Sequence, residues 1–572
     1  MNIYNHYLKL INNCVKDNKK NLELKDLNNF KGVILENPPT NFNYDFSTNI
    51  CLVLGKLNKL NSINLAKKIK KTLEENIGDF SEIEVAAPGF LNLNLSKKGT
   101  IRSILKILSN DNYGSIKENK NYNIEFVSAN PTGPLHVGHC RGAVFGDVLS
   151  NLLIFNGNKV TKEYYVNDYG NQIQNFLKSV YLRIREIKYN EKFTLSENIY
   201  PGLYIIEIAK KIIKKTKLDF KDYEKSKPLL GTEAIKSSME MIKEDLDKLG
   251  IKHDNFISER SNVEKKLVEK AIKKLKNNNY VIEGFLDPPK GEESKNWKKT
   301  KKLVFKSSLF GDDTDRALQK DDGSWTYFAN DVAYHFDKVS RNYDYLINVL
   351  GADHTGYIKR IAGAVSALSE TKTKLYCKVC QLVKLFKKGK PFKMSKRAGD
   401  FITVSDLLNE VDKDSIRFMM LNRSNDVEID FDFDKVLEKT KENPVFYVQY
   451  CYARICSLFR TLKIDLNELV QLDQENFNLN LYEKKILRKI YEWPKVINIS
   501  SQKLEPHRIP YYLYDLSTLF HAYWSKGNEN EELKFINNGK VKNKNTLVII
   551  KLISIVVKNG MNILGVSLPK KM

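Results

Sequence analysis

The chain carries few cysteines for its length, and their spacing shows no regular framework. Seven cysteines are scattered through 572 residues, which is typical of reduced thiols in a cytosolic protein rather than of disulfides. Cys377 and Cys380 form a C-x-x-C pair, but no second cysteine or histidine pair follows at zinc-binding spacing. We therefore expect free thiols and no tightly bound metal, with a metal site at this pair as the less favoured alternative.

Long apolar runs are also scarce. The longest, residues 547–557, is interrupted by Lys551 and is too short to cross a bilayer, so it predicts a core helix. The N-terminal segment MNIYNHYLKLINNCVKDNKK lacks a continuous apolar stretch and a small-residue cleavage site, so no export signal is predicted. These absences favour a cytoplasmic protein that does not use a membrane.

Acidic residues are outnumbered by basic ones. The formal net charge is +24 and the isoelectric point is about 9.3, which favours a polyanionic partner such as RNA. Lysine, asparagine and isoleucine are abundant along the whole chain, however, and codon bias in an AT-rich genome would produce part of the same excess. Charge alone therefore does not identify the partner. The length predicts roughly two to four domains rather than one core.

Hydrophobic patterning divides the chain into three regions. Residues 1–110 predict a small α+β domain, residues 111–437 an α/β domain with a parallel sheet, and residues 438–572 an all-helical domain. The expected elements are helices near the start, over 50–74 and over 136–155, strands at 91–95, 122–127, 159–166, 303–305 and 345–350, and a Lys-rich helical insertion at 174–279.

The motif NPTGPLHVGHCRG, residues 130–142, joins the strand at 122–127 to the helix that follows. A Pro/Gly loop opening a helix collects backbone N–H groups and the positive helix end, which suits a phosphate. His136 and His139 share one face of the first turn, where cationic or donating imidazoles would bind phosphate oxygens. Gly138 leaves room for a nucleoside against the backbone. The chain lacks P-loop and G-x-G-x-x-G motifs, so neither explains this site.

A second basic motif, KMSKRAG, begins at Lys393. Lys393 and Lys396, which flank Met394 and Ser395, would close over the β- and γ-phosphates of a nucleotide and stabilise the leaving pyrophosphate. In this order and separation, HVGH and KMSKR together resemble the paired signature of class I aminoacyl-tRNA synthetases, although Arg397 replaces the last serine of the general pattern. The resemblance implies a Rossmann-like catalytic domain, an N-terminal module that binds the tRNA elbow and a helical anticodon-binding domain.

The segments IEFVSANPTGPLHVGHCRGAVFGDVLSNLL, EYYVNDYGNQI, DGSWTYFANDVAYHFDK, VLGADHTGY and NPVFYVQYCYARI resemble bacterial-type arginyl-tRNA synthetases. A guanidinium substrate needs carboxylates within bidentate reach. By this resemblance, Glu125 and Asp331 take the guanidinium with help from Tyr327, while Asn130 and His136 hold the α-amino and carboxylate ends of arginine. Taken singly, each of these residues also has an ordinary structural explanation, as a strand-edge charge, a surface pair or a turn residue.

The nucleotide is expected between the two signature motifs. The resemblance implies that ATP, with Mg²⁺ as part of the substrate, lies near the GADH stretch, where Gly351 permits close backbone approach and Asp353 and His354 face the adenosine. Asp353 acting only as a turn cap is an equally good interpretation. Arginyl-adenylate and pyrophosphate form first, and transfer to the terminal adenosine of tRNA(Arg) then releases AMP. The resemblance also implies that activation requires tRNA.

Contacts with tRNA are expected at both ends of the chain. Tyr447, Tyr450 and Arg454 share one helix face that would stack on anticodon bases. The resemblance adds Met572 to that pocket and suggests Phe90 and Asn92 for the elbow; core packing is the alternative for the aromatic residues. Monomer is the family expectation.

Three other functions stay open at this point. They are a different class I synthetase, a small-molecule nucleotidyltransferase that shares the H-x-G-H loop, and a tRNA-binding paralogue without catalysis. A nucleotidyltransferase would lack the helical anticodon module, and intact His136, His139, Lys393 and Lys396 argue against an inactive paralogue.

Overall fold

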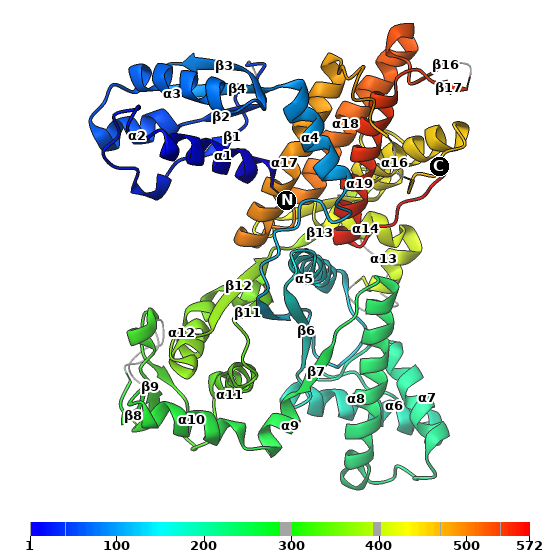
Figure 1. Cartoon of the computed structure of the whole chain (residues 1–572). Coiled ribbons are helices and arrows are strands. Elements are labelled where there is room, and N and C mark those ends of the chain that lie inside the picture. The colour runs from blue at the N-terminus through cyan, green and yellow to red at the C-terminus, as the bar shows by residue number, and fades with distance from the viewer. Residues whose placement is uncertain (1, 40–41, 287–299, 393–401, 469–470, 538) are drawn as a thin grey trace.

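The computed structural model describes residues 2–39, 42–286, 300–392, 402–468, 471–537 and 539–572. Figure 1 shows a blue N-terminal region lying beside the helices of the C-terminal region, with the green middle of the chain below them. The parallel-sheet, mixed N-terminal and helical C-terminal architecture predicted from the sequence is confirmed.

The N-terminal region is an antiparallel sheet with the strand order β1-β2-β4-β3, packed against helices. The predicted helix over 50–74 is wrong as one element, because the structure has two helices there, α2 and α3. Lys59 adopts a left-handed conformation with φ 57° and ends α2, and the Asn61 side chain then caps α3 by accepting from two backbone N–H groups. The elements of this region are α1 (Ile3–Asp17), β1 (Leu35–Glu36), β2 (Phe46–Thr48), α2 (Ile50–Asn58), α3 (Ser62–Asn76), β3 (Phe80–Ala86), β4 (Phe90–Leu95) and α4 (Lys97–Leu108).

The middle region is built on a parallel sheet with the order β12-β11-β5-β6-β7. Its strands are β5 (Asn121–Glu125), β6 (Lys159–Val166), β7 (Asn255–Ser258), β11 (Tyr345–Gly351) and β12 (Lys374–Cys380). Helix α5 (Val137–Phe155) connects β5 to β6 as predicted. It contacts the sheet and three later helices, α14 (Lys413–Met420), α17 (Leu481–Lys503) and α19 (Lys544–Leu564). The helix that begins at the HVGH motif therefore also reaches the C-terminal region.

The insertion over 174–279 is mostly helical, as predicted, but it also contains strand β7, which pairs with β6 and was not predicted. Four half-buried residues in a Lys-rich stretch carry too short a pattern to reveal a strand. The helices there are α6 (Asn171–Tyr189), α7 (Tyr204–Lys215), α8 (Tyr223–Lys248), α9 (Glu259–Glu264) and α10 (Leu267–Asn277).

The predicted strand at 303–305 is present as β9 (Lys302–Phe305), but it belongs to a separate antiparallel sheet, β10-β9-β8. This sheet is formed by β8 (Val281–Gly284), β9 and β10 (Arg316–Ala317), and it packs with α10, α11 (Tyr327–Ser340) and α12 (Ile358–Ser369).

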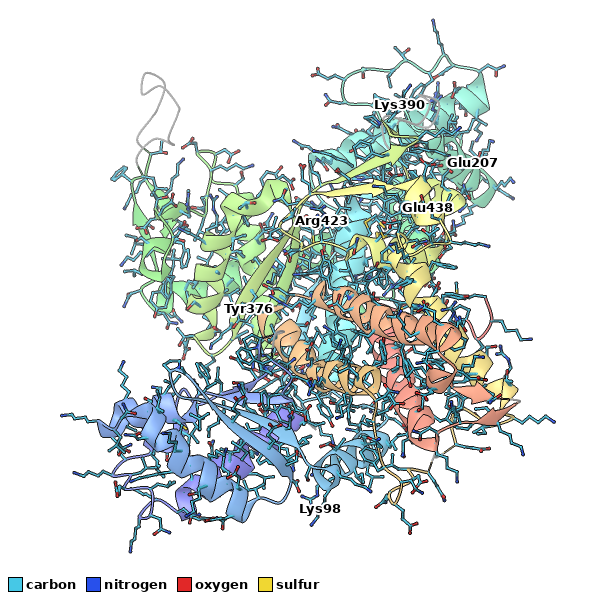
Figure 2. All side chains as sticks on the ribbon, turned by 90° about the horizontal axis from the view of Figure 1, so that it is seen from above. Lys98, Glu207, Tyr376, Lys390, Arg423 and Glu438 are labelled. Atoms are coloured by element: carbon cyan, nitrogen blue, oxygen red, sulfur yellow. The ribbon has the colours of Figure 1, made fainter. Side chains whose placement is uncertain are left out.

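A third small sheet, β14-β13-β15, follows the parallel sheet. Its elements are β13 (Val383–Lys387), β14 (Lys390–Pro391) and β15 (Ile429–Asp432), accompanied by α13 (Val404–Glu410), α14 (Lys413–Met420) and α15 (Phe433–Leu437). In Figure 2, Lys390 on β14 lies towards the end of the view that holds Glu207 of α7, and Lys98 of the N-terminal region lies at the opposite end.

The C-terminal region is a bundle of α16 (Pro444–Thr461), α17 (Leu481–Lys503), α18 (Arg508–Glu529) and α19 (Lys544–Leu564). The all-helical prediction missed a short hairpin, β16 (Ile536–Asn537) with β17 (Lys540–Val541). Among the described residues, one helix, α19, is long enough and apolar enough to span a membrane. However, 83% of its most apolar stretch is buried inside the protein. Residues 547–557 therefore lie in a core helix, as predicted.

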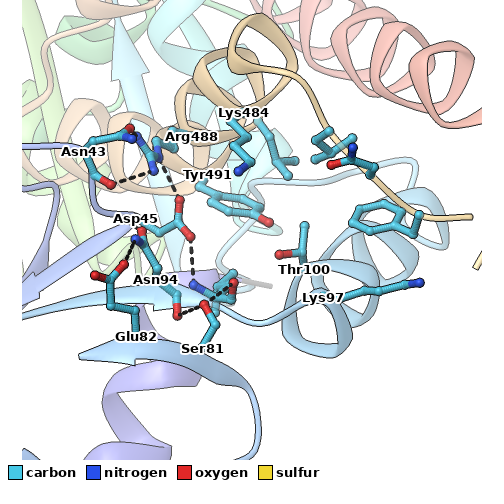
Figure 3. A pocket seen from close by; sticks show the side chains of 15 residues that line it. Asn43, Asp45, Ser81, Glu82, Asn94, Lys97, Thr100, Lys484, Arg488 and Tyr491 are labelled. Carbon is cyan, nitrogen blue, oxygen red and sulfur yellow. Dashed lines mark hydrogen bonds and ion pairs between the residues drawn. The ribbon is translucent and has the colours of Figure 1, made fainter.

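The N-terminal region is fastened to helix α17. Arg488 donates to Asp45 at 2.7 Å and to Asn43 at 2.7 Å, and the indole of Trp493 donates to the carbonyl of Tyr113 at 2.8 Å. Figure 3 shows the hollow that remains beside this contact, with a volume of about 350 Å³ and a mostly polar lining. These hydrogen bonds and the ion pair thus join the N-terminal region to the C-terminal helical bundle.

Candidate active site

The histidine turn, residues 136–139, forms the first turn of α5. His136 is the N-cap residue, and its Nδ1 accepts a hydrogen bond from the Gly138 N–H at 3.1 Å. The backbone N–H of His136 in turn donates to Nδ1 of His139 at 3.4 Å, so the two imidazoles complete a capping box. A Cβ on Gly138 would lie 2.8 Å from the His136 ring, which explains why glycine stands between the histidines.

Both imidazoles of the histidine turn are neutral at physiological pH. Burial lowers the pKa of His136, and burial together with the neighbouring ring lowers the pKa of His139 to about 3. These lowered pKa values favour the donating alternative considered from the sequence over the cationic one. A neutral ring whose Nδ1 accepts carries its proton on Nε2, which can donate to a phosphate oxygen. The two ring centroids are 3.8 Å apart, so both donors would address one region.

The lysine motif falls on residues that the structure does not describe: Lys393, Met394, Ser395 and Lys396 lie outside the described ranges. The structure describes the chain up to Phe392 and again from Ile402. Phe392 donates to the Leu385 carbonyl at 2.8 Å. Beyond the gap, Val137 donates to Ile402 at 2.9 Å and Val404 donates to Leu135 at 2.9 Å. Ile402 and Val404, where the described chain resumes, are therefore bonded to the backbone in and just before the histidine turn.

An acidic cavity of about 330 Å³ opens at the carboxyl ends of strands β5 and β11, where open α/β sheets commonly bind ligands. It brings together four residues singled out from the sequence, Glu125, Tyr327, Asp331 and Gly351, although Tyr327 stands at the mouth with 74% of its surface exposed. Asp331 lies on α11, one turn after Tyr327. Sequence reasoning missed these further lining residues: Tyr165, Glu259, Tyr334, His335, Asn348 and Tyr357.

We name Glu125, Glu259 and Asp331 the acidic cup. Burial, followed by the nearby Glu125, raises the pKa of Asp331 to about 6, against a hydrogen bond from Tyr357 that lowers it. Burial and then Asp331 raise the pKa of Glu259 to about 7. No described lysine or arginine lies within ion-pair distance of Asp331 or Glu259. Carboxyl groups whose ionised forms are destabilised by burial and by a neighbouring carboxylate provide a site for a cationic ligand.

Glu125 differs from the other two members of the cup, because it already has a cationic partner. Its Oε2 is paired with the ammonium of Lys338, a side chain with 0% exposure, and its Oε1 accepts from the Ser128 hydroxyl at 3.1 Å. The sequence prediction named Glu125 and Asp331 as the two guanidinium ligands. The structure adds Glu259, which directly follows the short strand β7 and gave no recognisable signal in the sequence.

Other predicted residues lie near the cavity without lining it. The Asn130 amide donates to Gln172, and His136 belongs to the histidine turn. Asp353 is exposed in a 3₁₀ turn, Ala352–Tyr357, directly after β11, and the side chain of His354 lies outside what the structure describes. A Cβ on Gly351 would lie 2.7 Å from the Asp353 carboxylate, so glycine permits this close turn.

The predicted tRNA residues of α16 form an aromatic cluster with α18. The guanidinium of Arg454 lies 4.3 Å from the ring centroid of Tyr450 and 5.2 Å from that of Trp524. The His521 ring is tilted against Tyr447, with 4.4 Å between the ring centroids, and burial lowers the pKa of His521 to about 4. Sequence reasoning did not identify His521 or Trp524, because they are distant in the chain.

The remaining predicted tRNA contacts have different exposure. Met572 is 53% exposed. The segment before it lies along α16, where the Arg460 guanidinium donates to the backbone carbonyl of Lys570 at 2.9 Å. On β4, Phe90 is half-buried, whereas Asn92 has only 3% of its surface exposed. These contacts stay predictions.

The two cysteines of the C-x-x-C pair lie three residues apart on strand β12. Side chains at odd spacing in a strand point to opposite faces, and Cys377 is half-buried while Cys380 is buried. This geometry does not favour joint coordination of a metal.

Comparisons with known proteins agree with this geometry. Residues 103–456 match the family described as tRNA synthetases class I (R), catalytic domain, residues 7–95 match the arginyl tRNA synthetase N terminal domain, and residues 448–572 match the DALR anticodon binding domain. An arginine–tRNA ligase of Pelagibacter ubique is 52% identical over the full length of both chains, and that of Roseobacter denitrificans is 40% identical, again over both full lengths.

Solved structures agree as well. A Campylobacter jejuni crystal structure assigned as an arginyl-tRNA synthetase has a TM-score of 0.72 and 32% identity, covering 84% of this chain and 100% of that one. The Thermus thermophilus arginyl-tRNA synthetase has the same fold, with a TM-score of 0.71 at 18% identity over both full lengths. From the matched domains and the full-length relatives, we conclude that this chain belongs to the arginyl-tRNA synthetase family.

Proposed function

We propose that the chain activates L-arginine with ATP in its acidic cavity and transfers the arginyl group to tRNA(Arg). The observation that carries the proposal is the acidic cup. Asp331 and Glu259 have raised carboxyl pKa values and no described lysine or arginine within ion-pair distance, and both line one cavity at the carboxyl ends of the strands. A guanidinium group would supply the missing positive charge in a flat shape that two carboxylates can grip.

In this proposal the cup holds the side chain of arginine, with Tyr327 at the mouth. Asn130 and His136 hold the amino and carboxylate ends, which must face the histidine turn. Because the guanidinium end is fixed at the carboxyl ends of β5 and β11, the α-carboxylate is presented to the nucleotide in one orientation. The cavity volume of about 330 Å³ is of the order that a small ligand occupies.

ATP with Mg²⁺ lies across the histidine turn. A carboxylate oxygen of arginine attacks the α-phosphorus, the bond to the bridging oxygen breaks, and pyrophosphate leaves. The Nε2 protons of His136 and His139 donate to phosphate oxygens as charge builds, and the α5 N-terminus adds its positive end. Lys393 and Lys396, with Met394 and Ser395 between them, approach the same phosphates, since the residues after them are bonded to the histidine turn. Gly138, Gly351, Asp353 and His354 border the adenosine.

The second step transfers the arginyl group. A hydroxyl of the terminal adenosine attacks the carbonyl carbon of the adenylate, and AMP leaves with the electrons of the broken anhydride bond. Tyr447, Tyr450, Arg454 and Met572 bind the anticodon, while residues 1–110, through Phe90 and Asn92, bind the elbow. The catalytic part spans 111–437 and the anticodon part 438–572. We further propose that the enzyme acts in the cytoplasm as a monomer.

Exchange of labelled pyrophosphate into ATP tests the function. We expect exchange with arginine and not with lysine, and we expect it only when tRNA is present. Exchange driven by a different amino acid would reassign the substrate. A protein that binds tRNA but shows no exchange with any amino acid would be a non-catalytic relative.

A further inference from the structure

A row of polar side chains lies buried where helix α11 covers the parallel sheet. Asn348, Glu125 and Glu163 occupy paired positions on the adjacent strands β11, β5 and β6. Paired positions of neighbouring strands project their side chains to the same face. A helix normally packs on a sheet through apolar groups, and buried charges at such a contact cost free energy unless each is paired.

Residues of α11 supply those partners, and we call the whole set the polar seam; its helix members are Tyr334, His335, Lys338 and Arg341. At one end of the seam, the Tyr334 hydroxyl donates to Glu163 at 2.8 Å, and Arg341 grips the same carboxylate with two nitrogens. The side chain of Glu163 has 0% exposure and does not line the acidic cavity. At this end of the seam, Tyr334 lines the cavity, whereas Glu163 and Arg341 do not.

At the other end, Lys338 joins the seam to the acidic cup. Its ammonium is fully buried, pairs with Glu125, donates to Asn348 Oδ1 at 3.1 Å and lies 4.4 Å from the Tyr334 ring centroid. Asn348 also donates to His335 Nε2 at 2.9 Å. Unlike Glu125 and Asn348, Lys338 does not itself line the cavity, so any effect on a ligand must pass through its neighbours.

The hydrogen-bond directions along this end are mutually consistent. His335 donates from Nδ1 to the carbonyl oxygen of Asp331 at 2.8 Å, and its Nε2 therefore accepts from the Asn348 amide. Burial lowers the pKa of His335 to about 3, so the ring is neutral and has one donor and one acceptor. A continuous chain of hydrogen bonds thus runs from the backbone of Asp331 through His335, Asn348 and Lys338 to the carboxylate of Glu125.

We propose that Lys338 is a positioning residue for arginine recognition. It holds the Glu125 carboxylate in place and, through Asn348 and His335, fixes where Asp331 stands relative to it. The inference rests on the proposed assignment of the acidic cup to the guanidinium. A planar cation gripped by several carboxylates tolerates little change in their separation, so the loss of Lys338 would weaken arginine binding and spare ATP.

The test is Lys338→Met in the full-length chain, measured by tRNA-dependent pyrophosphate exchange. Methionine has a similar length and no charge. We expect the KM for arginine to rise about 10- to 100-fold, in line with a misplaced binding group, and the KM for ATP to change less than about threefold. Arg341→Met is the matched control, because it removes a cation of the same seam that pairs with Glu163, which does not line the cavity, rather than with Glu125. We expect it to leave the arginine KM nearly unchanged.

A double-mutant cycle with Glu125→Gln separates positioning from general damage. If Lys338 acts through Glu125, then Lys338→Met added to Glu125→Gln changes the arginine KM less than about twofold. The double variant also replaces both charges by neutral groups, so it remains usable if the single Lys338 variant does not fold. Independent, multiplicative effects of the two substitutions, or an equal rise in KM for Arg341→Met, would overturn the proposal.

Asp331→Asn, measured in the same assay, separates this inference from the site assignment. An unchanged arginine KM for Asp331→Asn would remove the cup as the arginine site, and the role of Lys338 with it. A raised KM for Asp331→Asn together with an unchanged KM for Lys338→Met would overturn the positioning role alone.

Discussion

Replacing Asp331 by asparagine tests the acidic cup directly. The asparagine oxygen can still accept the hydrogen bond from Tyr357, so the local structure is retained while the negative charge is lost. Removing one partner of a desolvated charge pair costs about 2–5 kcal/mol. We expect a loss of about 3 kcal/mol in binding free energy, within this range, because the cup keeps Glu125 and Glu259. This loss corresponds to a rise of roughly 100-fold in the KM for arginine.

The KM for ATP provides the internal reference. Because the proposed nucleotide site is at the histidine turn rather than in the cup, the KM for ATP should change less than about threefold, consistent with loss of an interaction made only by arginine. Asp337→Asn is the matched control, since Asp337 lies on the same helix, is 33% exposed and pairs with Arg341 outside the cavity. Thermal unfolding checks integrity: we expect Asp331→Asn to be at least as stable as the parent, because Asp331 raises the pKa of Glu259 by repulsion.

Arginine-dependent pyrophosphate exchange over a range of arginine and ATP concentrations supplies both KM values. A rise of the same factor in both, or a rise as large for Asp337→Asn, would refute the guanidinium role of Asp331. An unchanged KM for arginine would refute the acidic cup as a whole.

Four further results are expected. The KM for arginine should fall as pH rises from 5.5 to 8, because Asp331 and Glu259 hold protons up to pH values of about 6 and 7 and a cation binds their ionised forms; a flat profile with a constant ATP KM would contradict this. His136→Asn keeps an N-cap acceptor, so its free energy of unfolding in urea should be about 1 kcal/mol higher than that of His136→Ala. Both variants lack the Nε2 donor, so kcat should fall roughly 100-fold in each. Gly565→Ala should lower the urea midpoint, because Gly565 has φ 66° and a Cβ there would lie 2.3 Å from a buried guanidinium; an unchanged midpoint would show that the helix end can shift. Arg454→Ala should weaken tRNA binding about tenfold in filter assays, as expected for a lost stacking partner, without changing the KM for ATP.

Local patterns were sufficient where a segment's structure depends on its own residues. The helix that begins at His136 and the strand at 159–166 were predicted at or near their observed bounds, because a Pro/Gly loop, a capping side chain and a long periodic pattern all lie within a few turns. The two signature motifs indicated the class I synthetases, and the segments around them indicated the arginyl family, because each motif consists of contiguous residues. The break at Lys59 was missed, since a left-handed lysine leaves no distinctive composition.

Contacts between residues that are distant in the sequence could not be predicted from local patterns. Glu259 enters the cup only because β7 adds to the edge of the parallel sheet, and four half-buried residues carry no clear pattern. Lys338 resembles any surface lysine in the sequence, yet it is fully buried against Glu125, 213 positions away. His521 and Trp524 likewise join Arg454 only through the packing of α18 on α16.

The amino-acid sequence by itself determined the family of the enzyme and the start of helix α5, because each depends on short-range pattern and side-chain chemistry. Only the tertiary structure decided the charge state of the histidines, the pairing of Glu125 and the membership of the acidic cup. Those properties depend on burial and on neighbours that folding brings together from distant parts of the chain, and local sequence does not record either one.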